Sequence, residues 1–192
     1  MALLLAYGWI LWKKESIESI YERAERYWYR LAANQGNAEA QNNLGEYYAS
    51  GQGVVQDYEE AVKWYRLAAE QRYAKAQNNL GECYASGQGV VQDYEEAVKW
   101  YRLAAKQRYA KAQNNLGFCY ASGQGVVQDY EEAVKWHRLA ADQGNADAQC
   151  QLGLFYADGQ GVSQNPSEAI RWMRLAADQG NENAKRWLSD NQ

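Results

Sequence analysis

The sequence predicts an all-α protein, a right-handed superhelical solenoid of paired antiparallel helices, and three observations predict it. First, the stretch GQGVVQDYEEAVKW begins at Gly51 and recurs unchanged at Gly87 and Gly123, and a diverged copy, GQGVSQNPSEAIRW, begins at Gly159. Each start lies 36 residues after the last (87 − 51). Second, each unit holds two segments whose apolar residues follow helical spacing. Third, turn and capping residues stand between these segments. A fixed period of roughly 20–50 residues is typical of solenoids, whose units bury their apolar faces against neighbouring units.

The two helices of a unit are predicted from their apolar stripes. The first, helix A, covers about residues 38–50. Its stripe has the spacing i, i+4, i+7, i+8 and consists of Ala40, Leu44, Tyr47 and Tyr48. The second, helix B, covers about residues 58–71. One face of it carries Ala61, Trp64, Tyr65 and Ala68.

The repeated loop between the two helices is predicted to be a structural turn. Gly51 stands where helix A must stop with a positive φ angle. Asp57, followed three residues later by Glu60, fits a capping box at the start of helix B. We expect Val54 and Val55 to pack the loop onto the core. The loop lacks the third glycine, the Lys-Ser/Thr pair and the preceding strand of a phosphate-binding loop.

The chain divides into one array with two irregular ends. Four units cover residues 37–72, 73–108, 109–144 and 145–180. Residues 1–36 are a degenerate N-terminal repeat with an apolar leading segment, and residues 181–192 are predicted to form a C-terminal capping helix. The second and third units differ at four positions only: Glu82/Phe118, Tyr101/His137, Lys106/Asp142 and Arg108/Gly144.

The segment AQNNLGEYYASGQGVVQDYEEAVKWYRLAA resembles the Sel-1-like repeat, a branch of the tetratricopeptide-like class. The resemblance implies an adaptor or assembly scaffold. Many members end helix B with glycine, whereas this chain has Arg72 and Arg108 in the first two units, so we expect those two helices to run on or to end differently. Some secreted relatives join the two helices of each unit with a disulfide. This chain lacks that cysteine pair, which weakens any inference from the enzyme-like members.

Composition argues against several function classes. The net charge is −4 and the pI is near 5.2, which disfavours a nucleic-acid partner. We expect no metal, no cofactor and no catalytic site. The single histidine, His137, is interpreted as a hydrogen-bonded structural residue. Equivalent positions of stacked helices lie roughly 10 Å apart, beyond the ~7 Å limit for a disulfide. The three cysteines are therefore expected to be reduced, which, with the lack of a complete signal peptide, favours the cytoplasm.

The predicted binding surface is the concave face, which helix A lines in paired-helix solenoids. Helical-wheel positions place eight candidates there: Lys75, Asn78, Asn79, Glu82, Lys111, Asn114, Asn115 and Phe118. Asparagine amides can both donate and accept, so this ladder could bind the backbone of a peptide. In that case, replacing Asn79 and Asn115 with alanine weakens binding at little cost to folding. The alternative is that the asparagines tie one repeat to the next.

The leading segment MALLLAYGWILW forms a second candidate surface, with Leu4, Trp9, Leu11 and Trp12 as its contact residues. Twelve residues span about 18 Å as a helix, short of the ~30 Å hydrocarbon core of a membrane. We favour protein contact, with a homodimer through this patch as its simplest form. The alternatives are contact with a membrane surface and a remnant of a longer signal or anchor segment. Together these features predict a non-catalytic scaffold that binds a peptide or protein. The alternatives are a secreted hydrolase-like or cell-wall-binding member, or an engineered consensus-type chain.

Overall fold

The computed structural model describes residues 27–191, in which every regular element is a helix. Residues 27–34 are helical and precede the labelled elements. These are α2 (Ala38–Ser50), α3 (Tyr58–Glu70), α4 (Ala74–Ser86), α5 (Tyr94–Lys106), α6 (Ala110–Ser122), α7 (Tyr130–Ala141), α8 (Ala146–Asp158), α9 (Pro166–Asp178) and α10 (Glu182–Asp190). Helices A and B therefore lie where the periodicity predicts them.

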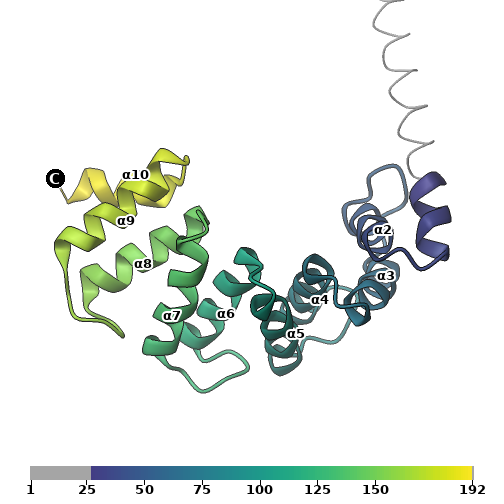
Figure 1. Ribbon diagram of the computed structural model, residues 1–192, viewed down its shortest axis with the longest axis horizontal. Coiled ribbons are helices and arrows are strands. Elements are labelled where there is room, and N and C mark those ends of the chain that lie inside the picture. Colours follow the sequence, from purple (N-terminus) through teal and green to yellow (C-terminus); the bar gives the residue numbers. More distant parts are fainter. Residues whose placement is uncertain (1–26, 192) are drawn as a thin grey trace, which may run out of the picture.

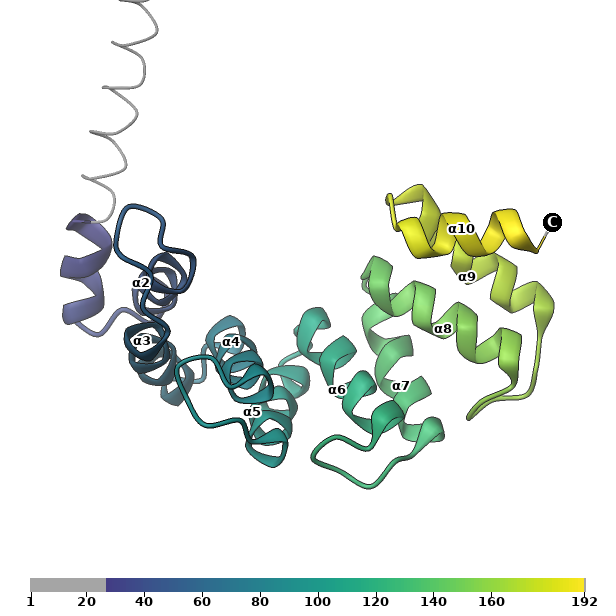
Figure 2. The same ribbon diagram turned by 180° about the vertical axis from the view of Figure 1, so that it is seen from behind.

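The helix pairs follow one another along an open arc (Figures 1 and 2). The main contacts join consecutive helices, both within a unit, as between α4 and α5, and between units, as between α5 and α6. In both views α4 lies toward the open side of the arc and α5 toward its outer side. The fold is thus a solenoid of helix pairs, as the period indicates.

Some of the predicted helix caps make hydrogen bonds to the helix end, and others do not. The Asp57 carboxylate accepts a hydrogen bond from the backbone N–H of Glu60 at 2.9 Å, which confirms the N-cap. The other half of the predicted capping box is not formed, because the Asp57 N–H donates to the carbonyl of Tyr48 and the Glu60 carboxylate pairs with Lys63. Gly51 ends α2 with φ 72°, in the left-handed region. At the N-caps of α4 and α6 the chain has Tyr73 and Tyr109, whose side chains make no capping hydrogen bond.

The prediction for the loop valines is wrong for one residue of each pair. Val55 and Val127 are each 88% exposed, and their counterpart Val91 is 89% exposed. The preceding valine does pack inward, since Val90 lies against a buried cluster. Successive side chains of an extended segment point in opposite directions, so only one of two neighbours can reach the core.

The expectation for Arg72 and Arg108 is also wrong. Both residues adopt the left-handed conformation, with φ 68° and 64°, and end α3 and α5 as Gly144 ends α7. The N–H of Arg72 reaches the carbonyl of Ala69 at 2.9 Å. A non-glycine residue there costs about 1 kcal/mol, which the rest of the fold offsets.

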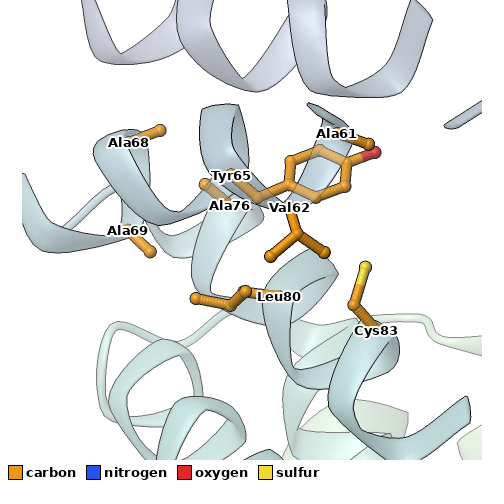
Figure 3. Close-up of a cluster of buried hydrophobic side chains, with 8 residues drawn as sticks. All are labelled: Ala61, Val62, Tyr65, Ala68, Ala69, Ala76, Leu80 and Cys83. Carbon is orange, nitrogen blue, oxygen red and sulfur yellow. The ribbon is translucent and has the colours of Figure 1, made fainter. Parts of the chain in front are cut away.

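The core lies mainly between helix B of one unit and helix A of the next. Figure 3 shows one such cluster, from α3 and α4: Ala61, Val62, Tyr65, Ala68, Ala69, Ala76, Leu80 and Cys83. Small residues let the helices approach closely, and a Cβ added at Gly81 would lie 2.7 Å from the ring of Tyr101. All three cysteines are free, as expected, and all three are buried.

The last helix, α10, covers the end of the array. Ala184 is fully buried, and Trp187 and Leu188 pack against a cluster that contains Cys150 and Met173. This helix has the position that helix A of a further unit would occupy.

Candidate interaction surface

Three asparagine and glutamate positions of helix A form a hydrogen-bonded network between units. The amide of Asn79 donates to Asn42 Oδ1 at 3.0 Å and to Glu46 Oε1 at 3.2 Å. One unit later, Asn115 donates to Asn78 Oδ1 at 3.0 Å and to Glu82 Oε1 at 3.1 Å. These contacts match the alternative that the sequence left open, in which the asparagines tie one repeat to the next.

Lysines extend the same network along the surface. Lys75 Nζ lies 2.7 Å from Glu46 Oε1, and Lys111 Nζ lies 2.8 Å from Glu82 Oε1. These side chains are about two-fifths to one-half exposed, so the ion pairs add little to stability. Their effect is to neutralise Glu46 and Glu82 on helix A of the first two units.

Burial changes the expectation for part of the predicted site. Asn78 is fully buried and Asn114 is 6% exposed, so neither has surface to offer a partner in this structure. Both belong to the junctions between units. The remaining candidates, Lys75, Asn79, Glu82, Lys111, Asn115 and Phe118, lie at least partly at the surface. Binding by them stays a prediction.

The polar network stops at the third unit. Phe118 occupies the position of Glu82 and is 41% exposed. Its ring meets the ring of His137 edge-on, with centroids 5.1 Å apart. His137 in turn replaces Tyr101, so two of the four differences between the near-identical units are in contact with each other.

His137 itself is a buried structural residue. Its Nδ1 lies 3.1 Å from Asn114 Oδ1, which requires the proton on Nδ1, and its ring also packs 5.7 Å from that of Phe155. Burial lowers the pKa of His137 to about 4, so the ring is neutral near pH 7. The prediction of a fully hydrogen-bonded histidine is only half right, because Nε2 has no hydrogen-bond partner. A side chain with no exposed surface is poorly placed for catalysis.

Sequence reasoning missed a second network, in which a buried glutamine of helix A pairs with an exposed glutamine at the end of helix B. Gln77 donates to the carbonyl of Ala69 at 3.1 Å, and its own oxygen accepts from Gln107 at 2.8 Å. The same pair of bonds recurs one unit later through Gln113 and Gln143. The signal was the recurrence of glutamine at both positions in every unit.

The second predicted surface lies outside the described residues, because Leu4, Trp9, Leu11 and Trp12 all precede residue 27. The first described turn is apolar and open, with Tyr27 65% and Trp28 64% exposed. None of the helices described is long and apolar enough to cross a membrane. Within residues 27–191, no group of histidine, cysteine, aspartate and glutamate could hold a metal ion.

Comparison with known proteins identifies the array. A family model described as the Sel1 repeat matches residues 26–37, 38–73, 74–109, 110–145 and 146–181. This chain belongs to the Sel1 repeat family. The matched units begin one residue later than those defined from the sequence, and the partial match at residues 26–37 is consistent with a degenerate first repeat. No curated protein matches the chain.

Several solved structures share the Sel1 fold. A protective antigen present in uropathogenic Escherichia coli strains is 44% identical, with a TM-score of 0.81, over 85% of this chain and 35% of its own length. A Sel1 repeat protein from Oxalobacter formigenes is 39% identical, with a TM-score of 0.77, over 81% of this chain and 63% of its own. The chain therefore spans less than two thirds of either protein. An immunity protein from Pseudomonas aeruginosa, 23% identical with a TM-score of 0.57 over 81% of this chain and 58% of its own, shares the fold alone.

Proposed function

We propose that this Sel1 repeat chain is a non-catalytic interaction scaffold whose helix A face binds a peptide or protein partner. Sel1 repeat scaffolds are generally non-catalytic, and the fold commonly mediates protein–protein interaction. The support specific to this chain is the exposed aromatic ring of Phe118. It stands where the preceding units carry a paired glutamate, and it follows a row of neutralised charges.

The contrast between the units indicates what the partner must supply. On the first units, the partner meets amide groups and ion pairs that already satisfy one another. At the third unit it meets Phe118 and, at the same position of the fourth unit, the half-buried Leu154. A partner that inserts an apolar side chain there gains roughly 25 cal/mol per Å² of apolar surface that it buries. Phe118 is therefore the residue expected to dominate binding.

The test uses the substitution Phe118→Glu, which restores the residue of the second unit in an otherwise near-identical setting. Affinity capture from a lysate of the source cells, followed by mass spectrometry, would compare it with wild type and with Val127→Ala on the exposed loop. We expect specific partners to be lost with Phe118→Glu and kept with Val127→Ala. The same set of proteins on all three baits would refute a role for this face.

A further inference from the structure

The opposite side of the array, formed by helix B, carries two equivalent grooves. The first has a volume of about 390 Å³, with Trp100 and Leu103 among its lining residues. The second, one unit later, has a volume of about 460 Å³ and is lined in the same way by Trp136 and Leu139. The two leucines are 44% and 48% exposed. Both volumes fall within the range of sites that bind organic ligands or side chains.

The rims of these grooves are basic, in a chain whose net charge is −4. Glu70, Arg72 and Lys106 line the first groove, and Lys106, Arg108 and Asp142 line the second, so the five residues, with Lys106 shared, carry a net charge of +1. The corresponding positions one unit further on are Asp142, Gly144 and Asp178, with a net charge of −2. The positive charge is thus confined to the centre of the array.

The three rim cations are free to meet a partner. In the part of the chain that the structure describes, every ion pair of a lysine or arginine involves other residues, such as Lys99 with Glu96 on the same helix. Side-chain hydrogen bonds likewise bypass Arg72, Lys106 and Arg108. Unpaired charges beside an apolar floor provide both attraction and orientation for an oppositely charged ligand.

The backbone conformation of Arg72 and Arg108 is a second reason to regard the groove rims as functional. The φ angle is 68° at Arg72 and 64° at Arg108, and the equivalent positions of the other units are Gly36, Gly144 and Gly180. Glycine would adopt this conformation without the penalty of about 1 kcal/mol that a side chain incurs. Local strain of this kind concentrates at functional positions. Within residues 27–191, Arg72 and Arg108 are the non-glycine residues with positive φ, and each lies on the rim of one groove.

The differences between the second and third units also point to the rims of these grooves. Two of their four differing positions, Lys106/Asp142 and Arg108/Gly144, lie on these rims. The other two form the Phe118–His137 contact on the helix A side. Three of the four differing positions therefore lie at least partly at the surface, and the fourth, at the buried His137, is in contact with one of them, Phe118.

We propose that the two grooves form a docking surface for an acidic amphipathic helix of a partner protein. The two grooves lie on successive units of the array, and seven residues of an α-helix rise about 10.5 Å and return to the same face, so one helix can present two apolar side chains along the array. Apolar side chains at positions i and i+7 would enter the two grooves. Acidic side chains beside them would meet Arg72, Lys106 and Arg108. This docking does not depend on the helix A face.

The experiment uses two fluorescein-labelled, 18-residue helical peptides that share leucines at i, i+3 and i+7. One carries glutamates at the flanking positions and the other carries lysines. Fluorescence anisotropy with the full chain should show binding of the glutamate peptide alone. Binding should weaken as salt is raised, because the rim charges are exposed.

The decisive variant is Arg72→Gly/Arg108→Gly, which removes both rim charges and relieves the backbone. We expect at least tenfold weaker binding together with a higher melting temperature, so loss of binding could not come from unfolding. Leu103→Ala should weaken binding several-fold, and Leu175→Ala, at the equivalent position outside the two grooves, should not. Unchanged affinity in the double-glycine variant, equal binding of the two peptides, or no binding of the glutamate peptide would each overturn the proposal.

Discussion

Replacing Asn115 with alanine should loosen the junction between the second and third units. The substitution removes the hydrogen bonds to Asn78 Oδ1 and Glu82 Oε1. Each is worth about 1 kcal/mol. It also leaves the oxygen of Asn78, a fully buried residue, without its donor. We therefore expect a loss of about 2 kcal/mol in the free energy of unfolding. For a chain of this size that corresponds to a melting temperature lower by roughly 4–8 °C.

Urea denaturation followed by circular dichroism at 222 nm would measure the loss. The matched control is Gln151→Ala, one unit further on, because the oxygen that Gln151 would reach, Asn114 Oδ1, already accepts from His137. The control should cost less than 0.5 kcal/mol, the usual range for a surface substitution. Equal stability of Asn115→Ala and Gln151→Ala would refute the structural reasoning. It would also restore the expectation that this asparagine can be removed at little cost to folding.

Two further predictions concern buried titratable groups. The pKa of His137 is about 4 in the folded chain, against 6.5 for an exposed histidine. As the pH falls, the unfolded chain therefore binds a proton at this residue before the folded chain does. The free energy of unfolding should fall by up to about 3 kcal/mol as the pH drops from about 6.5 to 4. His137→Met, which copies Met173 of the fourth unit, should lose less stability than wild type between pH 7 and pH 4.5, as measured by urea titration. An equal loss in the two proteins would contradict the lowered pKa of His137. Burial raises the pKa of Cys83 and Cys119 to about 11 and also raises that of Cys150, so a thiol reagent should modify the native protein slowly. In urea without reductant it should titrate three thiols, and a lower count would revive the disulfide-bonded alternative.

The sequence predicts the helices because their signals are local and repeated. The stripe on helix A, the Asp57 cap and the glycine at the end of each helix A act within a few residues, and averaging over four units removes noise. The same reasoning failed at Val55, because composition alone does not show which of two neighbouring valines faces inward. It failed at Arg72 because the packing of the following helix, and not the residue, determines the backbone there.

The candidate site was harder to predict than the fold. A helical wheel places Asn78 and Asn79 on one face, yet a difference of one position separates a fully buried amide from a partly exposed one. The wheel does not show the neighbouring unit that covers Asn78. The basic grooves depend on residues from two successive helices B and one helix A, a combination that no single segment reveals.

The bonds between units have a consequence for how the chain can change length. Arg102 reaches Tyr120 across 18 residues, Gln107 reaches Gln77 across 30, and Asn115 reaches Asn78 across 37. Excision of residues 73–108 would leave each of these offsets intact, since Arg66 would then meet Tyr120 and Asn115 would meet Asn42. The new seam, Arg72 followed by Tyr109, repeats the present Arg72–Tyr73 step. Deletion of residues 73–108 thus keeps all three kinds of bond between the units that become neighbours, whereas a deletion of any other length breaks them at once. Recombination between the first units can therefore shorten the array in steps of one whole unit.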